Sequence, residues 1–286
     1  MMALHIKPIR RYHFSPLRYP GGKTSLYPMI CDLLKENKKG EVTYIEPYAG
    51  GSGVALALLM MEKVSSVIIN DFDNAIYCFW KSILDNTSRF ISKIKSTDVN
   101  MKEWEKQKRI YENSKSEFLL GFATFFLNRT NYSGVITGRP IGGVEQKGQW
   151  KIDARFNKRT LIDRIERISY FKNRIQLENE DGLRLINRFS RRNDVFVYID
   201  PPYYVKGGSL YLNSYEHNDH LSLSKSLKSK KTMKWLLTYD NVSEIKAMYQ
   251  GYNIVPFEIN YSANKVCRGK EVMVFSKSTK IPRYIR

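Results

Sequence analysis

The sequence has no long apolar run, and this absence bears on membrane insertion. Its longest apolar stretch, Val54 to Met61, is about half the length that a membrane-spanning helix of roughly 18 residues needs. Residues 1–16 also lack the apolar core that a signal peptide contains. We therefore expect a protein with no membrane partner.

Cysteine and histidine are scarce as well. The three cysteines, Cys31, Cys78 and Cys267, are widely spaced and odd in number, so they suit neither a disulfide framework nor a CxxC metal pair. Only two of the four histidines, His217 and His220, lie close together, and a solvated loop is favoured there over a zinc site because further ligands are missing nearby. These scarcities predict a cytoplasmic protein with no bound metal.

Acidic residues are few compared with basic ones. The chain has 28 Asp and Glu against 47 Lys and Arg, which gives a net charge of +19. Such a surplus indicates a polyanionic partner, either nucleic acid or an anionic membrane surface, and the lack of an apolar span favours nucleic acid. With 286 residues, 42% of them hydrophobic, the chain is long enough for a core domain that carries an insertion.

Two blocks of alternating strand and helix patterns flank a segment of different character. The first block reads as strand, glycine-rich turn, helix and strand, a βαβ unit whose right-handed crossover makes the strands parallel. These elements are expected at residues 42–45, 46–53, 54–61 and 67–71. The second block is expected to hold a helix at 161–171, strands at 175–178, 195–199 and 235–239, and an antiparallel hairpin at about 252–262 and 271–277. The fold class predicted is α/β.

The segment between the blocks is predicted to be an insertion. Residues 82–127 look helical, with an aromatic stretch at 118–126, and residues 128–160 look like an irregular loop or hairpin rich in Lys and Arg. We therefore expect a catalytic domain formed by residues 1–81 and 159–286, and an insertion at residues 82–158.

Asp200-Pro-Pro-Tyr203 directly follows the strongest predicted strand, where ligands bind in open α/β sheets. Pro201 and Pro202 end the strand rigidly, because proline has a fixed φ and no N–H to donate. The Asp200 carboxylate and the Pro201 carbonyl can each accept one N–H of a primary amine on a planar ring, and Tyr203 can stack on that ring. The alternative is an ordinary turn after a strand.

Glycines cluster in Glu46-Pro-Tyr-Ala-Gly-Gly-Ser-Gly53, after the first predicted strand. They let a ligand approach the backbone closely, and Asp71, at the end of the next strand, is placed to hold ribose hydroxyls. The stretch lacks the full G-x-G-x-x-G pattern, so a dinucleotide is not implied. The alternative is structural: the glycines permit tight packing, and Asp71 caps a helix.

A nucleotide-hydrolysing site is disfavoured at Gly21-Gly-Lys-Thr24. A phosphate-binding P-loop needs a glycine where this sequence has Leu17, and no buried strand precedes the turn. Lys23 is still available to contact an anionic group of a small ligand.

Three stretches together resemble the Dam-type family (D12 class, alpha group) of DNA adenine-N6 methyltransferases. They are Arg18-Tyr-Pro-Gly-Gly-Lys23, the glycine-rich stretch from Glu46 to Gly53, and Asp200-Pro-Pro-Tyr203, in the order typical of that family. The resemblance implies a Rossmann-like sheet of the kind found in S-adenosylmethionine-dependent methyltransferases. It also implies a C-terminal antiparallel hairpin and a mostly helical DNA-recognition insertion.

The resemblance also implies roles for single residues. The catalytic corner would be Asp200, Pro201, Pro202 and Tyr203. The cofactor S-adenosyl-L-methionine would be bound by Tyr19, Gly22, Lys23, Glu46, Tyr48, Gly50, Gly53, Asp71, Asp181 and Asp200. Asp181 departs from the family pattern, because an aromatic residue does not follow it.

Six residues of the insertion are implied to bind DNA: Asn128, Arg129, Asn131, Tyr132, Arg139 and Lys147. Arg129 would contact a phosphate or support the fold, Tyr132 would pack beside the vacated base position, and Arg139 would read a guanine edge. The alternative for each is a solvated charge or an aromatic residue of the loop core.

The implied reaction transfers a methyl group to N6 of an adenine that has been flipped out of duplex DNA. Two other classes stay open: an enzyme of the same fold that methylates cytosine N4 or RNA adenine, and a catalytically silent DNA-binding relative. We expect a monomer, with a separately acting cognate restriction endonuclease as a further candidate partner.

Overall fold

A computed structural model describes residues 4–5, 13–19, 21–37, 40–205, 215–261 and 267–285. The chain divides into two compact units. The sheet unit comprises Met1–His13, Lys23–Phe72 and Arg174–Arg286, and the helical unit comprises Phe14–Gly22 and Asp73–Asn173. Pro20 of the N-terminal motif lies outside the described residues.

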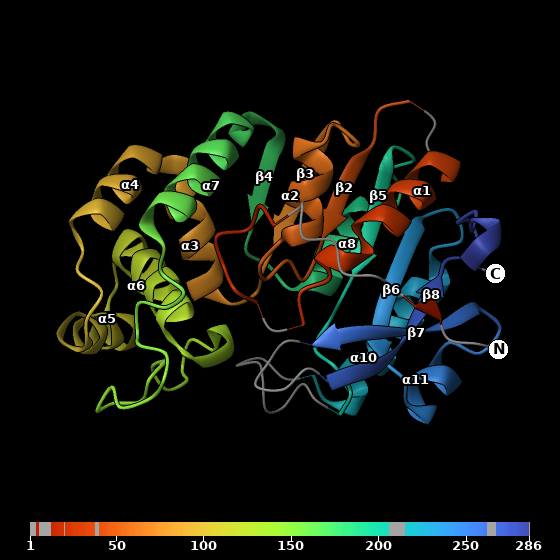
Figure 1. Cartoon of the computed structure of the whole chain (residues 1–286). Helices are drawn as coiled ribbons and strands as arrows, with labels where there is room; N and C mark the ends of the chain where they lie inside the picture. Colours follow the sequence, from red (N-terminus) through yellow and green to blue (C-terminus); the bar gives the residue numbers. More distant parts are fainter. Residues whose placement is uncertain are drawn as a thin grey trace. The chain divides into compact units, whose positions relative to one another are not determined.

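The sheet unit is built on one mostly parallel sheet with the strand order β1-β7-β8-β6-β5-β2-β3-β4 (Figure 1). Only the pairs β6–β8 and β7–β8 are antiparallel, which confirms the predicted C-terminal hairpin. The strands are β1 (Leu4–His5), β2 (Thr43–Glu46), β3 (Ser66–Asn70), β4 (Ile175–Glu178), β5 (Val195–Ile199), β6 (Lys234–Asp240), β7 (Asn253–Tyr261) and β8 (Cys267–Phe275).

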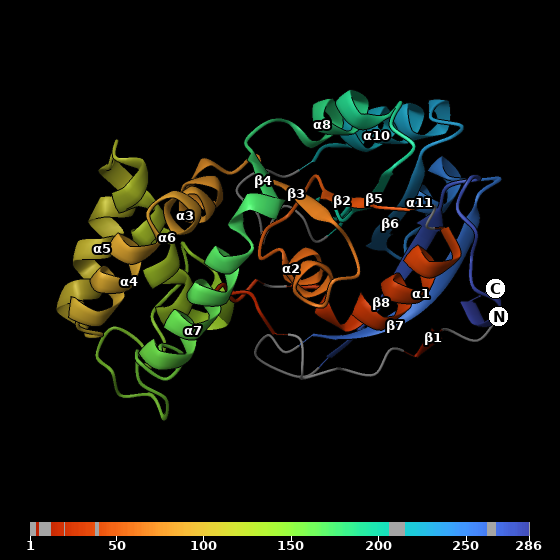
Figure 2. The same ribbon diagram turned by 90° about the horizontal axis from the view of Figure 1, so that it is seen from above.

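Helices cover both faces of this sheet. Seen from above, α1 and α2 lie on one face and α8 and α10 on the other (Figure 2). Every residue of β5 is buried, as its continuous apolar run predicts for a central parallel strand. The helices of the unit are α1 (Tyr27–Asn37), α2 (Gly53–Met60), α8 (Gly182–Phe189), α10 (His217–Ser229) and α11 (Ser243–Met248), with 3₁₀ turns η2 (Thr24–Leu26) and η5 (Arg283–Ile285).

The strand order reverses between β2 and β5. The chain runs outward from β2 through β3 to β4, and then returns to the other side of β2 to form β5 and β6. At such a switch point the loops after the two central strands diverge and leave a crevice for ligands. The glycine-rich stretch follows β2 and Asp200 follows β5, so both predicted motifs lie there.

The helical unit has a core rich in phenylalanine. Phe79 and Phe90 pack with Phe118, Phe122 and Phe125, at centroid distances between 5.4 and 6.1 Å. Side chains cap the amino ends of four of its helices: Asp73, Asn100, Ser116 and Asn157 accept hydrogen bonds from backbone N–H groups. Its elements are α3 (Asn74–Asp85), α4 (Thr87–Ser96), α5 (Met101–Asn113), α6 (Glu117–Thr130), α7 (Lys158–Tyr170) and η3 (Tyr132–Gly134), and η4 (Lys172–Arg174) follows α7.

This unit is larger than the predicted insertion at 82–158. It begins at Asp73 and ends at Asn173, and it includes the segment Phe14–Gly22. The reason is packing: Phe79 of α3 stacks on Phe125 of α6, so α3 buries its apolar face against the insertion. For residues 128–160 the prediction left an irregular loop and a hairpin open. The structure shows the irregular loop, since that region holds turns and one isolated bridge, Asn131 to Pro140.

The histidine pair does not lie in a solvated loop as expected. His217 begins α10, and His220 is buried in the first turn of that helix. No group of His, Cys, Asp or Glu in the described residues is arranged to hold a metal ion. Within the same part of the chain, no helix is long and apolar enough to cross a membrane.

Candidate functional site

The Asp200 carboxylate is oriented by three side chains. Its Oδ1 accepts a hydrogen bond from Thr238 Oγ1 at 2.7 Å and a longer one from Tyr203 Oη at 3.4 Å, and Lys23 Nζ lies 3.3 Å from its Oδ2. Because Thr238 donates to Asp200, the Tyr198 hydroxyl, 2.9 Å away, donates to Thr238. The Asp200 side chain is 21% exposed, so the carboxylate is both fixed and reachable.

The backbone after this corner is held by an acid that sequence reasoning missed. Asp240, at the end of β6, accepts the N–H of Tyr204 at 3.0 Å and the N–H of Val205 at 2.9 Å. Among the hydrogen bonds between described residues, none ends on the Pro201 carbonyl. An acid at the end of the strand next to β5 is the signal that could have revealed Asp240.

The sequence predicts that the ring of Tyr203 can stack on the substrate ring, but this ring is largely enclosed. Its side chain is buried, with Lys23 Nζ 5.0 Å from the ring centroid and the Tyr239 ring 6.4 Å away. Burial, followed by the negative charges of Asp200 and Glu271, raises the pKa of its hydroxyl well above the usual value. Stacking on the face that Lys23 covers requires this ammonium group to move.

Glu46 supports the glycine-rich loop from inside. Its Oε2 accepts from Ser52 Oγ at 3.1 Å, and its Oε1 accepts from the N–H of Ala55 at 3.0 Å. The loop turns sharply, because both Gly50 (φ 46°) and Ser52 (φ 48°) have left-handed backbone conformations. Burial raises the pKa of Glu46 to about 8, against the lowering effect of these two hydrogen bonds.

The ends of β2, β3 and β4 are tied together by polar contacts. Asp71 Oδ2 accepts the N–H of Gly50 at 2.8 Å, which joins the two predicted cofactor elements. Asn70, which sequence reasoning missed, donates from Nδ2 to the carbonyls of Pro47 at 2.8 Å and Glu180 at 2.9 Å, and accepts the Glu180 N–H at 2.9 Å. The buried amide of Asn70 therefore fixes the spacing of these three strand ends.

Two glycines after the strands β2 and β4 lie very close to neighbouring side chains. An added Cβ at Gly182 would lie 2.5 Å from the ring of Tyr48, whose hydroxyl is 2.8 Å from that of Tyr215. An added Cβ at Gly53 would lie 2.3 Å from Thr24 Oγ1, which explains the glycine at the start of α2. Asp181 lies beside Gly182 and caps α8 by accepting the Arg184 N–H at 3.0 Å.

Of the predicted cofactor contacts, two belong to the helical unit. Tyr19 and Gly22 lie there, and the Gly22 N–H donates to the Tyr19 carbonyl at 3.1 Å. The other eight predicted cofactor contacts belong to the sheet unit: Lys23, Glu46, Tyr48, Gly50, Gly53, Asp71, Asp181 and Asp200.

Asn128 and Asn131 have structural roles in place of the predicted contacts with DNA. Both side chains are buried. Asn128 accepts the Arg18 N–H at 2.7 Å and donates to the carbonyls of Arg18 and Gly134, each at 2.8 Å. Asn131 accepts from Trp104 Nε1 at 2.7 Å and donates to the carbonyls of Val135 and Ile136. These amides shape the loop and leave no group for a base or a phosphate.

Arg129 lies in a cluster of arginines within the helical unit. Its guanidinium donates to the Arg155 carbonyl, with Nε at 2.7 Å. Burial, and then the positive charges of Arg18, Arg164 and Arg155, lower its pKa. In the described part of the chain, no ion pair joins any of these four arginines to a carboxylate. The cluster therefore suits an anion such as a phosphate.

The other three predicted DNA contacts lie on the surface of the helical unit. Tyr132 is 50% exposed, and its N–H donates to the carbonyl of the exposed Arg139 at 3.0 Å. Lys147 pairs with Glu145 at 2.6 Å, and both side chains are exposed. A solvated ion pair of this kind contributes little to stability, so Lys147 is available to another anion.

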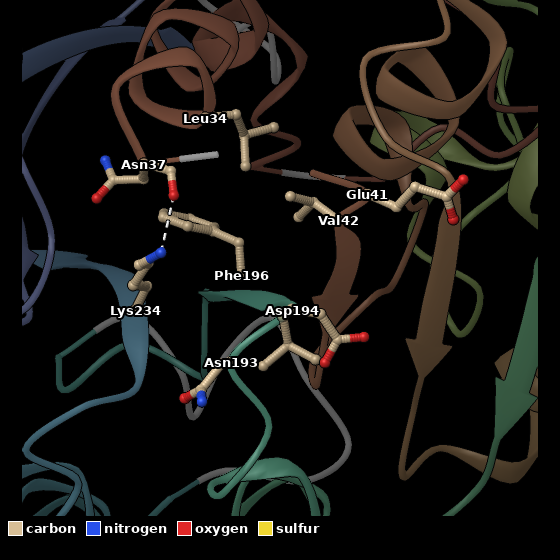
Figure 3. A pocket seen from close by; sticks show the side chains of 9 residues that line it. Leu34, Asn37, Glu41, Val42, Asn193, Asp194, Phe196 and Lys234 are labelled. Carbon is tan, nitrogen blue, oxygen red and sulfur yellow. Dashed lines mark hydrogen bonds between the residues drawn. The ribbon is translucent and has the colours of Figure 1, made fainter. Parts of the chain in front are cut away.

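A small pocket of the sheet unit lies away from this site. It lies among Leu34, Asn37, Val42, Phe196 and Lys234, at the amino ends of the central strands, where Lys234 Nζ donates to the Asn37 carbonyl at 2.8 Å (Figure 3). Its volume is about 10 Å³, which is room for roughly one water molecule.

Comparison with known proteins identifies one family. Residues 19–263 match the family of D12 class N6 adenine-specific DNA methyltransferases. The type II methyltransferase M.MjaIII of Methanocaldococcus jannaschii is 26% identical over 263 residues, which cover 83% of this chain and 88% of that protein. The type II methyltransferase M1.LlaDCHI of Lactococcus lactis subsp. cremoris is 23% identical over 275 residues, which cover 88% of this chain and 91% of that protein.

Two further similarities are to a viral protein and to a solved structure. The type II methyltransferase M.CviBI of Paramecium bursaria Chlorella virus NC1A is 24% identical over 252 residues, which cover 86% of this chain and 90% of that protein. Among solved structures, the rRNA methyltransferase aviRa of Streptomyces viridochromogenes superposes with a TM-score of 0.41 at 12% identity, covering 96% of this chain and 95% of that chain.

Glu46→Gln is expected to change how stability depends on pH. The folded chain keeps a proton on Glu46 up to about pH 8, whereas the ordinary pKa is 4.5. Between these values the folded state binds one more proton, so the free energy of unfolding falls with rising pH by up to ~1.4 kcal/mol per pH unit. Glutamine removes this contribution. Urea unfolding from pH 5 to 9 measures it, with the exposed Glu36→Gln as control, and equal pH slopes in wild type and E46Q would contradict it.

Asn128→Ala is expected to destabilise the helical unit by on the order of 3 kcal/mol, because the substitution leaves the partly buried backbone groups of Arg18 and the buried carbonyl of Gly134 without their partner. Urea unfolding measures the loss. Asn113→Ala is the matched control, since this exposed amide donates only to the Arg109 carbonyl, and it should change stability by less than ~0.5 kcal/mol. Equal effects of the two substitutions on the free energy of unfolding would show that the Asn128 hydrogen bonds do not stabilise the helical unit.

Proposed function

We propose residue roles from one premise: the chain belongs to the family of D12 class N6 adenine-specific DNA methyltransferases. It is a site-specific DNA methyltransferase that modifies adenine. The observation that carries the residue roles is the Asp200 carboxylate, which is fixed by Thr238 and Lys23 and still partly exposed at the β2–β5 switch point.

S-adenosyl-L-methionine is the methyl donor in this proposal. Asp71 and Asp181 follow the neighbouring strands β3 and β4, and both are partly exposed, so their carboxylates suit ribose hydroxyls and an exocyclic amine. The sharp turn at Gly50 and the contact of Tyr48 with Gly182 define the adjoining walls. When bound, this donor supplies an electrophilic methyl group on a positively charged sulfur.

Asp200 positions the amine and stabilises charge. Flipping the adenine costs a few kcal/mol, and the exposed carboxylate oxygen and the Pro201 carbonyl then each accept one N–H of its amino group. This arrangement directs the nitrogen lone pair and places a negative charge where positive charge develops on the amine. Asp200 need not remove a proton first, because the proton can leave to solvent after transfer.

The helical unit binds the DNA backbone in this proposal. Arg18, Arg129, Arg155 and Arg164 form an anion site that suits a phosphate, and Tyr132, Arg139 and Lys147 are exposed on the same unit. Duplex DNA also accounts for the net charge of +19. The relatives are named type II methyltransferases, and we extend this role to the chain. In this proposal it is a monomeric modification enzyme that acts separately from a restriction endonuclease.

Asp200→Ala is expected to lower kcat for methylation of duplex DNA by on the order of 10³-fold, because the developing charge on the amine loses its acceptor. Incorporation of tritiated methyl groups, with N6-methyladenine identified in the digested product, measures it. The exposed Asp163→Ala is the control, and duplex binding by D200A should persist. Turnover by D200A at the wild-type rate would refute the assignment.

Arg155→Ala is expected to weaken duplex binding and to lower the slope of log Kd against log salt concentration by about 0.9, the change for one lost phosphate contact. The side chain is exposed, and only its carbonyl holds Arg129, so the local fold is kept. Fluorescence anisotropy at several salt concentrations measures the slope. Lys228→Ala, an exposed lysine of the sheet unit, should leave it unchanged. An unaltered slope in R155A would exclude Arg155 from the interface.

A further inference from the structure

Lys23 lies between two carboxylates in the sheet unit. Its Nζ is 3.3 Å from Asp200 Oδ2 and 3.7 Å from Glu271 Oε1, and its side chain is only 4% exposed. Glu271 belongs to β8, opposite Asp240 of β6 in the antiparallel register. Three strands or strand ends thus contribute charges to one small region: β5 through Asp200, β6 through Asp240 and β8 through Glu271.

The two partners of Lys23 differ in their access to a substrate. The Asp200 side chain is 21% exposed, whereas that of Glu271 is 1% exposed. Glu271 therefore cannot reach an adenine that Asp200 binds, and any effect of Glu271 on the reaction passes through Lys23 or Tyr203. A buried carboxylate is costly to keep unless it is paired, which indicates that Lys23 stabilises Glu271 as well as Asp200.

We propose that Glu271 is a positioning residue for methyl transfer: it shares the Lys23 ammonium with Asp200 and so preserves the negative charge of the amine acceptor. This inference rests on the proposed role of Asp200. It adds a buried residue that no sequence motif marked.

Counting charges shows why a second carboxylate matters. With their ordinary charges, Asp200, Lys23 and Glu271 together carry −1. Without Glu271 the pair Asp200 and Lys23 sums to zero and Asp240 is the negative charge that remains beside it, so the negative field that acts on the amine is weaker. In a site shielded from water such a difference acts strongly on the transition state.

Glu271 also eases the approach of the amine. An incoming N–H competes with Lys23 for Asp200, because Oδ1 already accepts from Thr238 at 2.7 Å and Oδ2 faces Lys23. Since Glu271 is within 3.7 Å, Lys23 can shift toward it and stay paired. The same shift draws the ammonium away from Asp200 at the moment when the carboxylate must balance the amine.

The first experiment compares Glu271→Gln with Glu271→Asp. E271Q keeps the shape and loses the charge, and we expect kcat for DNA methylation to fall on the order of 10- to 100-fold at saturating donor and DNA. Binding of duplex DNA should be unchanged. E271D keeps the charge on a shorter side chain and should lose several-fold less. A wild-type kcat in E271Q would overturn the proposal.

The second experiment separates charge sharing from support of the fold. In the double variant K23M/E271Q the remaining Asp200 again carries −1, so we expect kcat about 10-fold above that of E271Q. A merely structural Glu271 predicts a double variant no better than E271Q, and that result would overturn the proposal. Any weaker binding of the donor through loss of Lys23 affects KM, which is measured separately.

The controls keep the outcomes distinct. Should E271Q fail to fold by circular dichroism, the double variant takes its place, since the one charge that it leaves unpaired, Asp200, is 21% exposed. A folded double variant as inactive as D200A would overturn the proposal. Failure of the proposed function would show differently, as wild-type turnover in D200A. With D200A inactive, the E271Q and double-variant results bear on Glu271 alone.

Discussion

The parallel pairing of β2 with β5 is the constraint on which the rest of the site depends. Thr43, Tyr44 and Ile45 lie opposite Val195, Phe196 and Val197, so segments far apart in the sequence end at the same edge of the sheet. The loop supported by Glu46 and the corner at Asp200 are neighbours only because of this register. A slip by one residue would exchange the two faces of a strand that is buried throughout, which makes the register costly to lose.

The site is built on buried polar groups that the surface motifs do not reveal. Asn70 ties three strand ends together, Asp240 holds the backbone after the catalytic corner, and Glu46 supports the glycine-rich loop from within. Each is stabilised by partners that the fold supplies, and each would be expensive to bury alone. Their common effect is to hold the partly exposed carboxylates of Asp71, Asp181 and Asp200 in place. In the proposed function this fixed arrangement is the condition for electrostatic catalysis.

The sequence predicted the elements whose signals are local. Strands 175–178 and 195–199 are confirmed at those bounds. Val195–Ile199 is a continuous apolar run, which marks a buried strand, whereas Ile175–Glu178 alternates apolar and polar residues, which marks a half-buried one. The start of the helical unit at Asp73 was not predictable, since α3 continues the α/β rhythm and only its packing on α6 assigns it. Asn128 resembled a DNA contact because an asparagine beside an arginine looks the same in sequence whether its amide faces a phosphate or the Arg18 backbone.

In the helical unit, the side chains that shape the loop around η3 differ from the side chains that are exposed on it. Asn128 and Asn131 use buried amides to fix the backbone on both sides of η3, and these contacts involve backbone groups, Trp104 excepted. The exposed Tyr132 and Arg139 take part in this frame through their main chains, which are joined by a hydrogen bond, and their side chains are left to contact a ligand. A side chain that the loop does not need for its shape can be exchanged at little cost in stability. In such a loop the side chains that we propose to contact DNA can therefore change while the backbone that presents them is retained.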